Sequence, residues 1–133
     1  IFCSSGGDGS KPIARIVNLA VTAGDPVIML EEPIPATRRV LDRAGMTMKD
    51  IDLFEVNEAF APIPLAWMKA LDADPSKLNV NGGAIALGHP LGMTGNRQVA
   101  TLLHQLRRRG QRYGVVSMCI GTGMGAAAVF EAE

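Results

Sequence analysis

The sequence has few of the residues that build metal centres or disulfide frameworks. It contains two cysteines and two histidines among 133 residues, and none of them stands at the spacing of a metal site. We therefore expect no bound metal. Two cysteines, Cys3 and Cys119, are too few for a disulfide framework. Free thiols are typical of reducing compartments, so a cytoplasmic location is expected.

Excess charge and long apolar runs are also absent. Thirteen basic side chains balance thirteen acidic ones, so no net field attracts nucleic acid or an acidic membrane surface. The arginines at 107–109 are expected to form the solvated end of a helix. No apolar run approaches the roughly 20 residues that a membrane-spanning helix needs. The hydrophobic share, 47%, is enough for the core of a single domain.

Strand-like and helix-like patterns alternate along the chain without an internal repeat. The expected elements are a buried strand at Ala14–Ala23, a helix from Pro33 to Gly45, a strand at 52–56, a helix beginning near Ala61, a helix from Thr94 to Gly110, and strands at 113–118 and 126–130. This order predicts an α/β fold, with a mixed β-sheet covered by helices and ending in a β-hairpin. Residues 1–13 lack the pattern of a secretory signal and are expected to be a flexible lead-in or a cut end.

Two of the expected helices have informative first turns. Pro62 and Pro64 lack amide hydrogens and fit only the first turn of a helix, which leaves 57–60 as an ordered loop. Thr94 is a candidate N-cap for the later helix, and Gly110 follows its basic last turn. The positive end of that helix is then expected to point toward the loop before it.

That loop contains the first of three polar groups placed where an apolar run meets a turn. His89 lies in the glycine-rich stretch 79–95, Asn57 begins the segment Asn-Glu-Ala-Phe, and Cys119 begins Cys-Ile-Gly-Thr-Gly. A neutral imidazole near pH 7 can take a proton from a thiol and activate it. From the residues alone, other interpretations stay open: His89 could only tie a loop, Asn57 could only cap a turn, and Cys119 could only pack in the core.

The motifs Asn-Glu-Ala-Phe, Gly-His-Pro and Cys-x-Gly-x-Gly, in this order, resemble the C-terminal catalytic domain of thiolases, the acyl-CoA acetyltransferases. The resemblance runs over about 14–131, so 14–133 is expected to be that domain. It implies acyl transfer between 3-ketoacyl-CoA or acetyl-CoA and CoA, by thiolysis or Claisen condensation. Coenzyme A and acyl-CoA would be substrates, with no permanently bound cofactor. In this family the nucleophilic cysteine lies in the N-terminal half, which this chain lacks, so the chain alone is expected to be inactive.

The resemblance also implies a role for each polar group. His89 would activate the absent cysteine and donate a hydrogen bond to the thioester oxygen, and Asn57 would hold a water that completes this oxyanion site. Cys119 would carry a proton to and from the methyl carbon of acetyl-CoA, with a pKa lowered by nearby donors. The amide of Gly121 would form one arm of a second oxyanion hole. Phe60 would line the pantetheine channel, with a core position as the alternative.

The remaining polar residues are expected to have other roles. Glu58 is expected to order the loops through hydrogen bonds. Cys3 has no apolar strand before it and is not expected to be catalytic, and His104 is expected to be a surface or packing residue of its helix.

The resemblance also suggests partners, and it leaves two other functions open. An exposed apolar layer would dock the missing N-terminal thiolase half, and the full protein is expected to be a homodimer or homotetramer. One alternative is a ketoacyl synthase-like condensing enzyme, although such enzymes use a second histidine where this chain has Asn57. The other is a non-catalytic thiolase-like scaffold or binding subunit.

Overall fold

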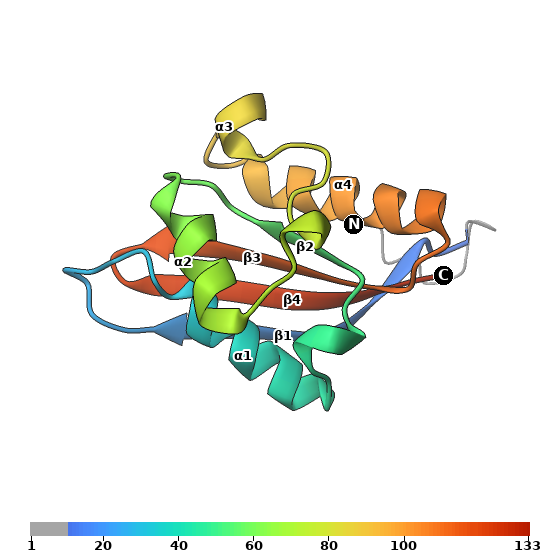
Figure 1. Cartoon of the computed structure of the whole chain (residues 1–133), viewed down its shortest axis with the longest axis horizontal. Coiled ribbons are helices and arrows are strands. Elements are labelled where there is room, and N and C mark those ends of the chain that lie inside the picture. The colour runs from blue at the N-terminus through green and yellow to red at the C-terminus, as the bar shows by residue number, and fades with distance from the viewer. Residues whose placement is uncertain (1–10) are drawn as a thin grey trace.

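The computed structural model describes residues 11–133, so the expectation for Cys3 lies outside the described residues. One four-stranded mixed sheet organises this part of the chain (Figure 1). The strands lie in the order β1-β4-β3-β2; β2 and β3 are parallel, and the other neighbouring pairs are antiparallel. The bounds of the strands are β1 Ala14–Ala23, β2 Leu53–Val56, β3 Tyr113–Gly121 and β4 Met124–Ala132.

Helices cover both faces of the sheet, as the sequence predicts. Their bounds are α1 Pro33–Ala44, α2 Pro62–Leu71, α3 Ala84–Leu87 and α4 Thr94–Arg109, with 3-10 turns η1 Met48–Asp50 and η2 Pro75–Lys77. One core cluster joins the two helices α1 and α2 to Phe54, Val115 and Val129 of the sheet, through Ala36, Val40, Leu41 and Trp67. The second cluster joins α4 to the other face through Leu53, Val116 and Phe130.

The helix α2 begins where the two prolines allow it to begin. Ala61 is the N-cap residue, Pro62 and Pro64 lie in the first turn, and no amide hydrogen is missing from the helix interior. The side chain of Trp67 is fully buried and donates from Nε1 to Thr37 Oγ1 at 3.0 Å. Its ring meets that of Phe54 edge-on, with the centroids 5.2 Å apart. This contact joins α1, α2 and β2 in one core.

The strand β1 is not buried on both faces, and the prediction of a buried strand was wrong. Ala20 and Thr22 are buried toward α1, but Leu19 and Val21 are 57% and 53% exposed. A β-bulge between Ile16 and Asn18 shifts the register against β4. The helix α4 covers β2 and β3, so the same face of β1 is left open among the described residues.

The C-terminal hairpin is longer than its sequence pattern indicates. Cys119 pairs with Gly125 inside the ladder, whereas the sequence predicted it in the turn between the strands. The backbone turns only at Thr122 and Gly123, which have φ values of 49° and 77°. A side chain at Gly125 would meet the backbone of Glu32 at 2.6 Å, so the lack of side chains there lets the strand continue beneath α1.

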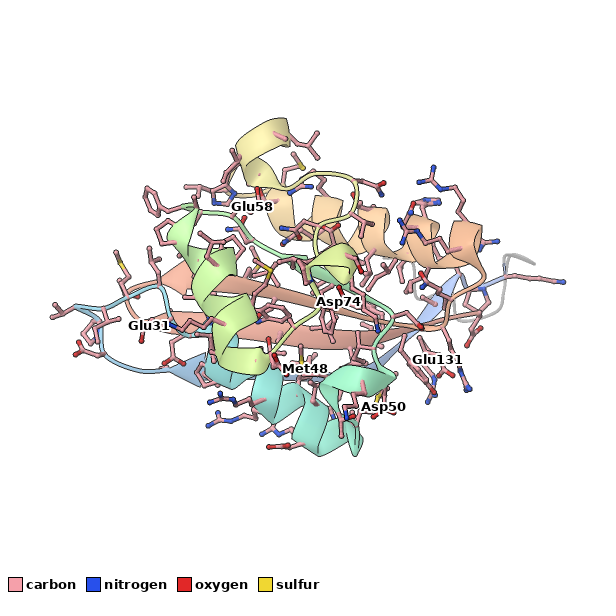
Figure 2. All side chains as sticks on the ribbon, in the orientation of Figure 1. Glu31, Met48, Asp50, Glu58, Asp74 and Glu131 are labelled. Atoms are coloured by element: carbon pink, nitrogen blue, oxygen red, sulfur yellow. The ribbon has the colours of Figure 1, made fainter. Side chains whose placement is uncertain are left out.

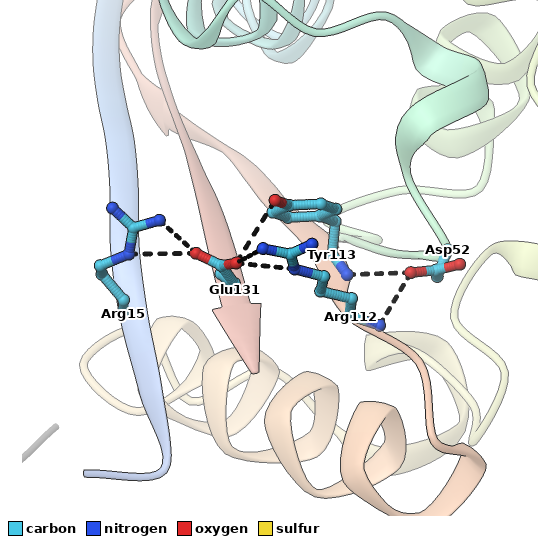
Figure 3. Close-up of polar contacts among 5 residues, drawn as sticks. All are labelled: Arg15, Asp52, Arg112, Tyr113 and Glu131. Atoms are coloured by element: carbon cyan, nitrogen blue, oxygen red, sulfur yellow. Dashed lines mark hydrogen bonds and ion pairs between the residues drawn. The ribbon is translucent and has the colours of Figure 1, made fainter. Parts of the chain in front are cut away.

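A group of charged side chains closes the sheet at the end opposite the hairpin turn (Figure 3). The carboxylate of Glu131, 7% exposed, forms ion pairs with Arg15 and Arg112 and also accepts from the Tyr113 hydroxyl at 3.3 Å. Hydrogen bonds from the two guanidinium groups lower the pKa of Glu131. Asp52 accepts from the backbone amides of Arg112 and Tyr113, each at 2.9 Å. These contacts fix the start of β3 against β2 and β4.

The basic end of α4 is solvated, as expected. The three arginines at 107–109 are exposed, and Gly110 ends the helix in the left-handed conformation. None of the helices found in residues 11–133 has the length and apolar character needed to cross a membrane.

Candidate functional site

The parallel pairing of β2 and β3 brings two of the predicted site residues to one edge of the sheet. Val56 lies beside Ser117, and the amide of Asn57 donates to Ser117 O at 2.9 Å. Asn57 is therefore the first residue beyond β2, next to the part of β3 that contains Cys119. Its side chain is 1% exposed and lies near enough to the Cys119 thiol to lower the pKa of that thiol.

His89 reaches the same edge from the loop between α3 and α4. Gly88 ends α3 with φ of 88°, a value that suits glycine, and the imidazole follows directly. The Nε2 atom of His89 lies 3.5 Å from Asn57 Nδ2, the long limit of a hydrogen bond. The structure thus brings together the three polar groups that the sequence singled out.

The contact with Thr94 favours one tautomer of the His89 imidazole. The Thr94 hydroxyl lies 2.7 Å from His89 Nδ1 and donates to Pro90 O at 3.0 Å. With its one proton directed at Pro90 O, the hydroxyl oxygen is the acceptor for Nδ1–H. In the neutral ring this leaves the lone pair on Nε2, which faces Asn57 and can act as a base.

Thr94 is not the N-cap of α4, so that prediction was wrong. The N-cap residue is Met93, and Thr94 lies inside the first turn without exposed surface. Its hydroxyl is occupied by His89 and Pro90, so it cannot also cap the helix. The sequence signal for the contact between Thr94 and His89 is a threonine five residues after a histidine in a tight loop, and it is recognised only once the structure is known.

Replacing Thr94 by Val should keep the shape of the first turn and remove the partner of Nδ1. The imidazole would then populate both tautomers and turn more freely, so the kcat of a reaction in which the whole protein uses His89 Nε2 as a base should fall about 10- to 100-fold. Replacing Thr94 by Ser retains the hydroxyl and should stay within about threefold of the original rate. Steady-state kinetics of the two variants checks this, and equal losses would assign Thr94 to packing alone.

The thiol of Cys119 is held in its protonated form. Burial raises the pKa of Cys119, and the hydrogen bonds from its own backbone and from Asn57 only partly offset this effect. The expectation of a lowered pKa was therefore wrong. The pKa of Cys119 is shifted by burial and by neutral hydrogen-bonding groups, and not by a neighbouring cation that would stabilise the thiolate. Such a thiol can donate a proton, and it becomes a base only when another group or a substrate stabilises its thiolate.

Gly121 and Phe60 occupy less enclosed positions. Gly121 lies two residues beyond Cys119, has φ of 86°, and has no atoms where a Cβ would stand. Its requirement for glycine is thus one of backbone conformation. Phe60 is 63% exposed at the start of α2, so the alternative of a core position is wrong, and its contact with a pantetheine stays a prediction.

Buried polar atoms lie near the site, at β2 and the first turns of α4. Among the described residues, Glu55 Oε2, Gln98 Oε1 and the three guanidinium nitrogens of Arg97 are buried without a hydrogen-bond partner. Desolvation raises the pKa of Glu55 to about 7, with a further rise from the charge of Glu58, while Arg97 acts in the opposite direction. The sequence pattern did not indicate this group, because a Glu inside a four-residue apolar strand gives no periodic signal.

Glu55 should make the stability of the fold depend on pH. Its folded-state pKa of about 7 lies above the value of 4.5 that is ordinary for a glutamate, so the folded chain binds the proton more tightly. The contribution of Glu55 to stability is therefore fully present below about pH 4.5 and is lost as the pH rises through 7, by up to about 3 kcal/mol. Urea unfolding at several pH values, followed by Trp67 fluorescence, measures this slope. Replacing Glu55 by Gln should flatten it, whereas Glu31→Gln, at an exposed position, should not.

No group of three or more His, Cys, Asp or Glu side chains that could hold a metal is found in residues 11–133. The imidazole, the amide and the protonated thiol instead form a site suited to moving protons. The domain is thus an α/β protein with these three polar groups at the carboxyl ends of two parallel strands, β2 and β3.

Comparison with known proteins identifies the family. The model of the thiolase C-terminal domain matches residues 10–132. A steroid 3-ketoacyl-CoA thiolase of Mycobacterium tuberculosis is 53% identical over 123 residues, which are 92% of this chain and 30% of that protein. The chain therefore belongs to the thiolase family, and it spans about 30% of the length of the relatives it matches.

Solved structures give the same result. The acetyl-CoA acetyltransferase of Bacillus anthracis superposes with a TM-score of 0.91 at 47% identity, over 94% of this chain and 32% of that one. Human mitochondrial 3-ketoacyl-CoA thiolase in complex with CoA gives a TM-score of 0.90 at 55% identity, over 92% of this chain and 31% of that one. The predictions of a thiolase C-terminal domain and of its α/β fold are thereby confirmed.

Proposed function

We propose that this chain supplies the C-terminal part of a thiolase active site, which transfers an acyl group between 3-ketoacyl-CoA or acetyl-CoA and CoA. The observation that carries the proposal is the His89 imidazole, whose Nδ1 is bonded to Thr94 and whose Nε2 lone pair faces Asn57. The nucleophile would be a cysteine of a segment outside this chain.

In the proposed thiolysis, His89 Nε2 takes the proton of that cysteine, and the thiolate attacks the ketone carbon of a 3-ketoacyl-CoA. The resulting Nε2–H donates to the oxyanion, together with a water held by Asn57; each such donor is typically worth roughly 3 kcal/mol of barrier. The carbon–carbon bond then breaks, and the enolate of acetyl-CoA leaves. Its carbon takes the proton of the Cys119 thiol, which burial keeps protonated.

The second half of the reaction restores both groups. The Cys119 thiolate takes the proton of an incoming CoA thiol, and the CoA thiolate attacks the thioester on the nucleophilic cysteine. That cysteine leaves as a thiolate and recovers its proton from His89. The Gly121 amide would stabilise the oxyanion of acetyl-CoA, and Phe60 would contact the pantetheine. Claisen condensation is the same sequence in reverse.

The remainder of the enzyme is proposed to dock on the open face of β1 and β4. A groove of about 430 Å³ runs there beside α4, and apolar side chains such as Leu19, Val21 and Leu91 line it. These three are all more than half exposed in this chain. An N-terminal thiolase half that covers this face would bury them and bring its cysteine to the site. A homodimer or homotetramer of the whole protein is part of this proposal.

The location stays a prediction. The expected location is cytoplasmic, whereas some relatives of this chain are named as mitochondrial or peroxisomal enzymes.

The test begins with the denatured mass of the protein as its source makes it. A species much heavier than 14.1 kDa should cleave acetoacetyl-CoA in the presence of CoA, and the 133-residue chain alone should not. A natural species of 14.1 kDa without a complementing subunit would oppose the proposal and favour a scaffold. Activity only with acyl groups on a carrier protein would favour a ketoacyl synthase-like enzyme.

A further inference from the structure

Asn79 uses every polar atom of its side chain on the residues around Asn57. Its Oδ1 accepts from the amide of Val56 at 2.9 Å, and its Nδ2 donates to the carbonyl of Val56 at 3.0 Å and to Glu58 Oε1 at 2.9 Å. Val56 and Glu58 are the two neighbours of Asn57 in the chain. One side chain therefore holds both neighbours of Asn57, Val56 through its backbone and Glu58 through its carboxylate.

Glu58 extends this contact to the segment that carries His89. Its Oε2 accepts from the amide of Ile85 at 3.0 Å, in the first turn of α3, where the N-cap residue Gly83 offers no side chain. A Cβ at Gly83 would lie 2.1 Å from the Glu58 carboxyl carbon, so the carboxylate fits only against glycine. Figure 2 shows Glu58 on the segment between β2 and α2, on the side of α3.

The helix α3 ends at Gly88, and His89 follows it. One connected set of hydrogen bonds thus runs from Val56 through Asn79 and Glu58 to α3. Asn57 itself has little else to orient it, because its Oδ1 has no partner among the described residues and its Nδ2 approaches His89 at the long limit of a hydrogen bond.

We propose that Asn79 and Glu58 are positioning residues that set the separation of Asn57 and His89. The inference rests on the proposed function, since that separation matters only if the two side chains share an oxyanion. A change of about 1 Å in such a pair can cost about 100-fold in rate. Both residues act through others, and neither needs to touch the substrate.

The test first removes and then reverses the hydrogen bond from Asn79 to Glu58, and it uses the whole protein as purified from its source. Asn79→Asp keeps the size of the side chain and tolerates the φ of 45° at this position, but it loses both donors and places a carboxylate against Glu58. We expect kcat to fall about 10- to 100-fold, with the KM for CoA within about twofold. Amide exchange of Ile85 should become faster.

The double variant Asn79→Asp with Glu58→Gln restores the hydrogen bond with its polarity reversed, because the new amide can donate to the new carboxylate. It should recover part of the lost kcat, at least about threefold, and slow the exchange of Ile85 again, while the donor to the Val56 carbonyl stays absent. Asn81→Asp is the matched control, an exposed asparagine of the same loop that contacts Gln105, and it should change neither quantity.

Three results would overturn the inference: an Asn79→Asp variant within about twofold of the original kcat, a loss of kcat without faster exchange at Ile85, or a double variant no better than the single one. If the unaltered protein cleaves no 3-ketoacyl-CoA, the proposed function fails separately. Amide exchange then tests the hydrogen-bonded contact alone, and unchanged exchange at Ile85 in the Asn79→Asp variant rejects it.

Discussion

In the whole protein, replacing His89 by Ala should abolish acyl-enzyme formation and reduce thiolysis by at least about 1,000-fold. The imidazole is proposed to act twice, first as the base that takes the thiol proton and then as a donor to the oxyanion. A positioned base contributes roughly 100- to 10,000-fold and an oxyanion donor roughly 100- to 1,000-fold. The rate of acetoacetyl-CoA cleavage by CoA measures the loss, and the mass of the protein after incubation with acyl-CoA reports the acyl-enzyme.

The second histidine provides a matched control. His104 is exposed on α4, so His104→Ala should stay within about twofold of the original rate. Full-rate thiolysis by the His89→Ala protein would remove His89 from the mechanism. A loss in both variants would instead indicate damage to α4 and its packing.

Replacing Cys119 by Ala should separate proton transfer from acylation. Without the thiol, exchange of the methyl hydrogens of acetyl-CoA with deuterated water should fall about 100- to 10,000-fold, whereas some acyl-enzyme should still form. Mass spectrometry of the recovered acetyl-CoA and of the protein measures the two steps independently. The His89→Ala protein should be deficient in acylation, so the two variants have different signatures.

The pH dependence of this exchange follows from the direction of the pKa shift. Burial raises the pKa of Cys119, so the exchange rate of the unaltered protein should still be rising above neutral pH. If Cys119→Ala impaired neither exchange nor acylation, Cys119 would be a packing residue only.

Local signals predicted most of the elements and the identity of the site residues. Prolines fixed the starts of α1 and α2, and Gly45 fixed the end of α1, because their backbone conformations act within one or two residues. The three motifs pointed to Asn57, His89 and Cys119, and parallel pairing of β2 with β3 explains how residues 62 positions apart meet.

Properties that depend on packing could not be predicted in the same way. The pattern of β1 is that of a buried strand, but burial depends on whether a helix lies opposite, and α4 covers other strands. The pKa of Cys119 depends on how far burial outweighs two hydrogen bonds. The roles of Thr94 and Asn79 arise from contacts whose partners are known only once the loops are folded.

The charged group around Glu131 includes Tyr113, the first residue of β3, and Cys119 lies near the other end of that strand. Tyr113 and Cys119 are six residues apart, which is roughly 20 Å along the strand. Substitutions at two places so far apart usually have additive effects. A protein engineer could therefore strengthen the sheet at Arg15, Asp52 or Arg112 and use the added stability as a reserve for variants at the other end. Enzymes with new acyl specificities often need such a reserve, because substitutions that alter a site tend to weaken the fold.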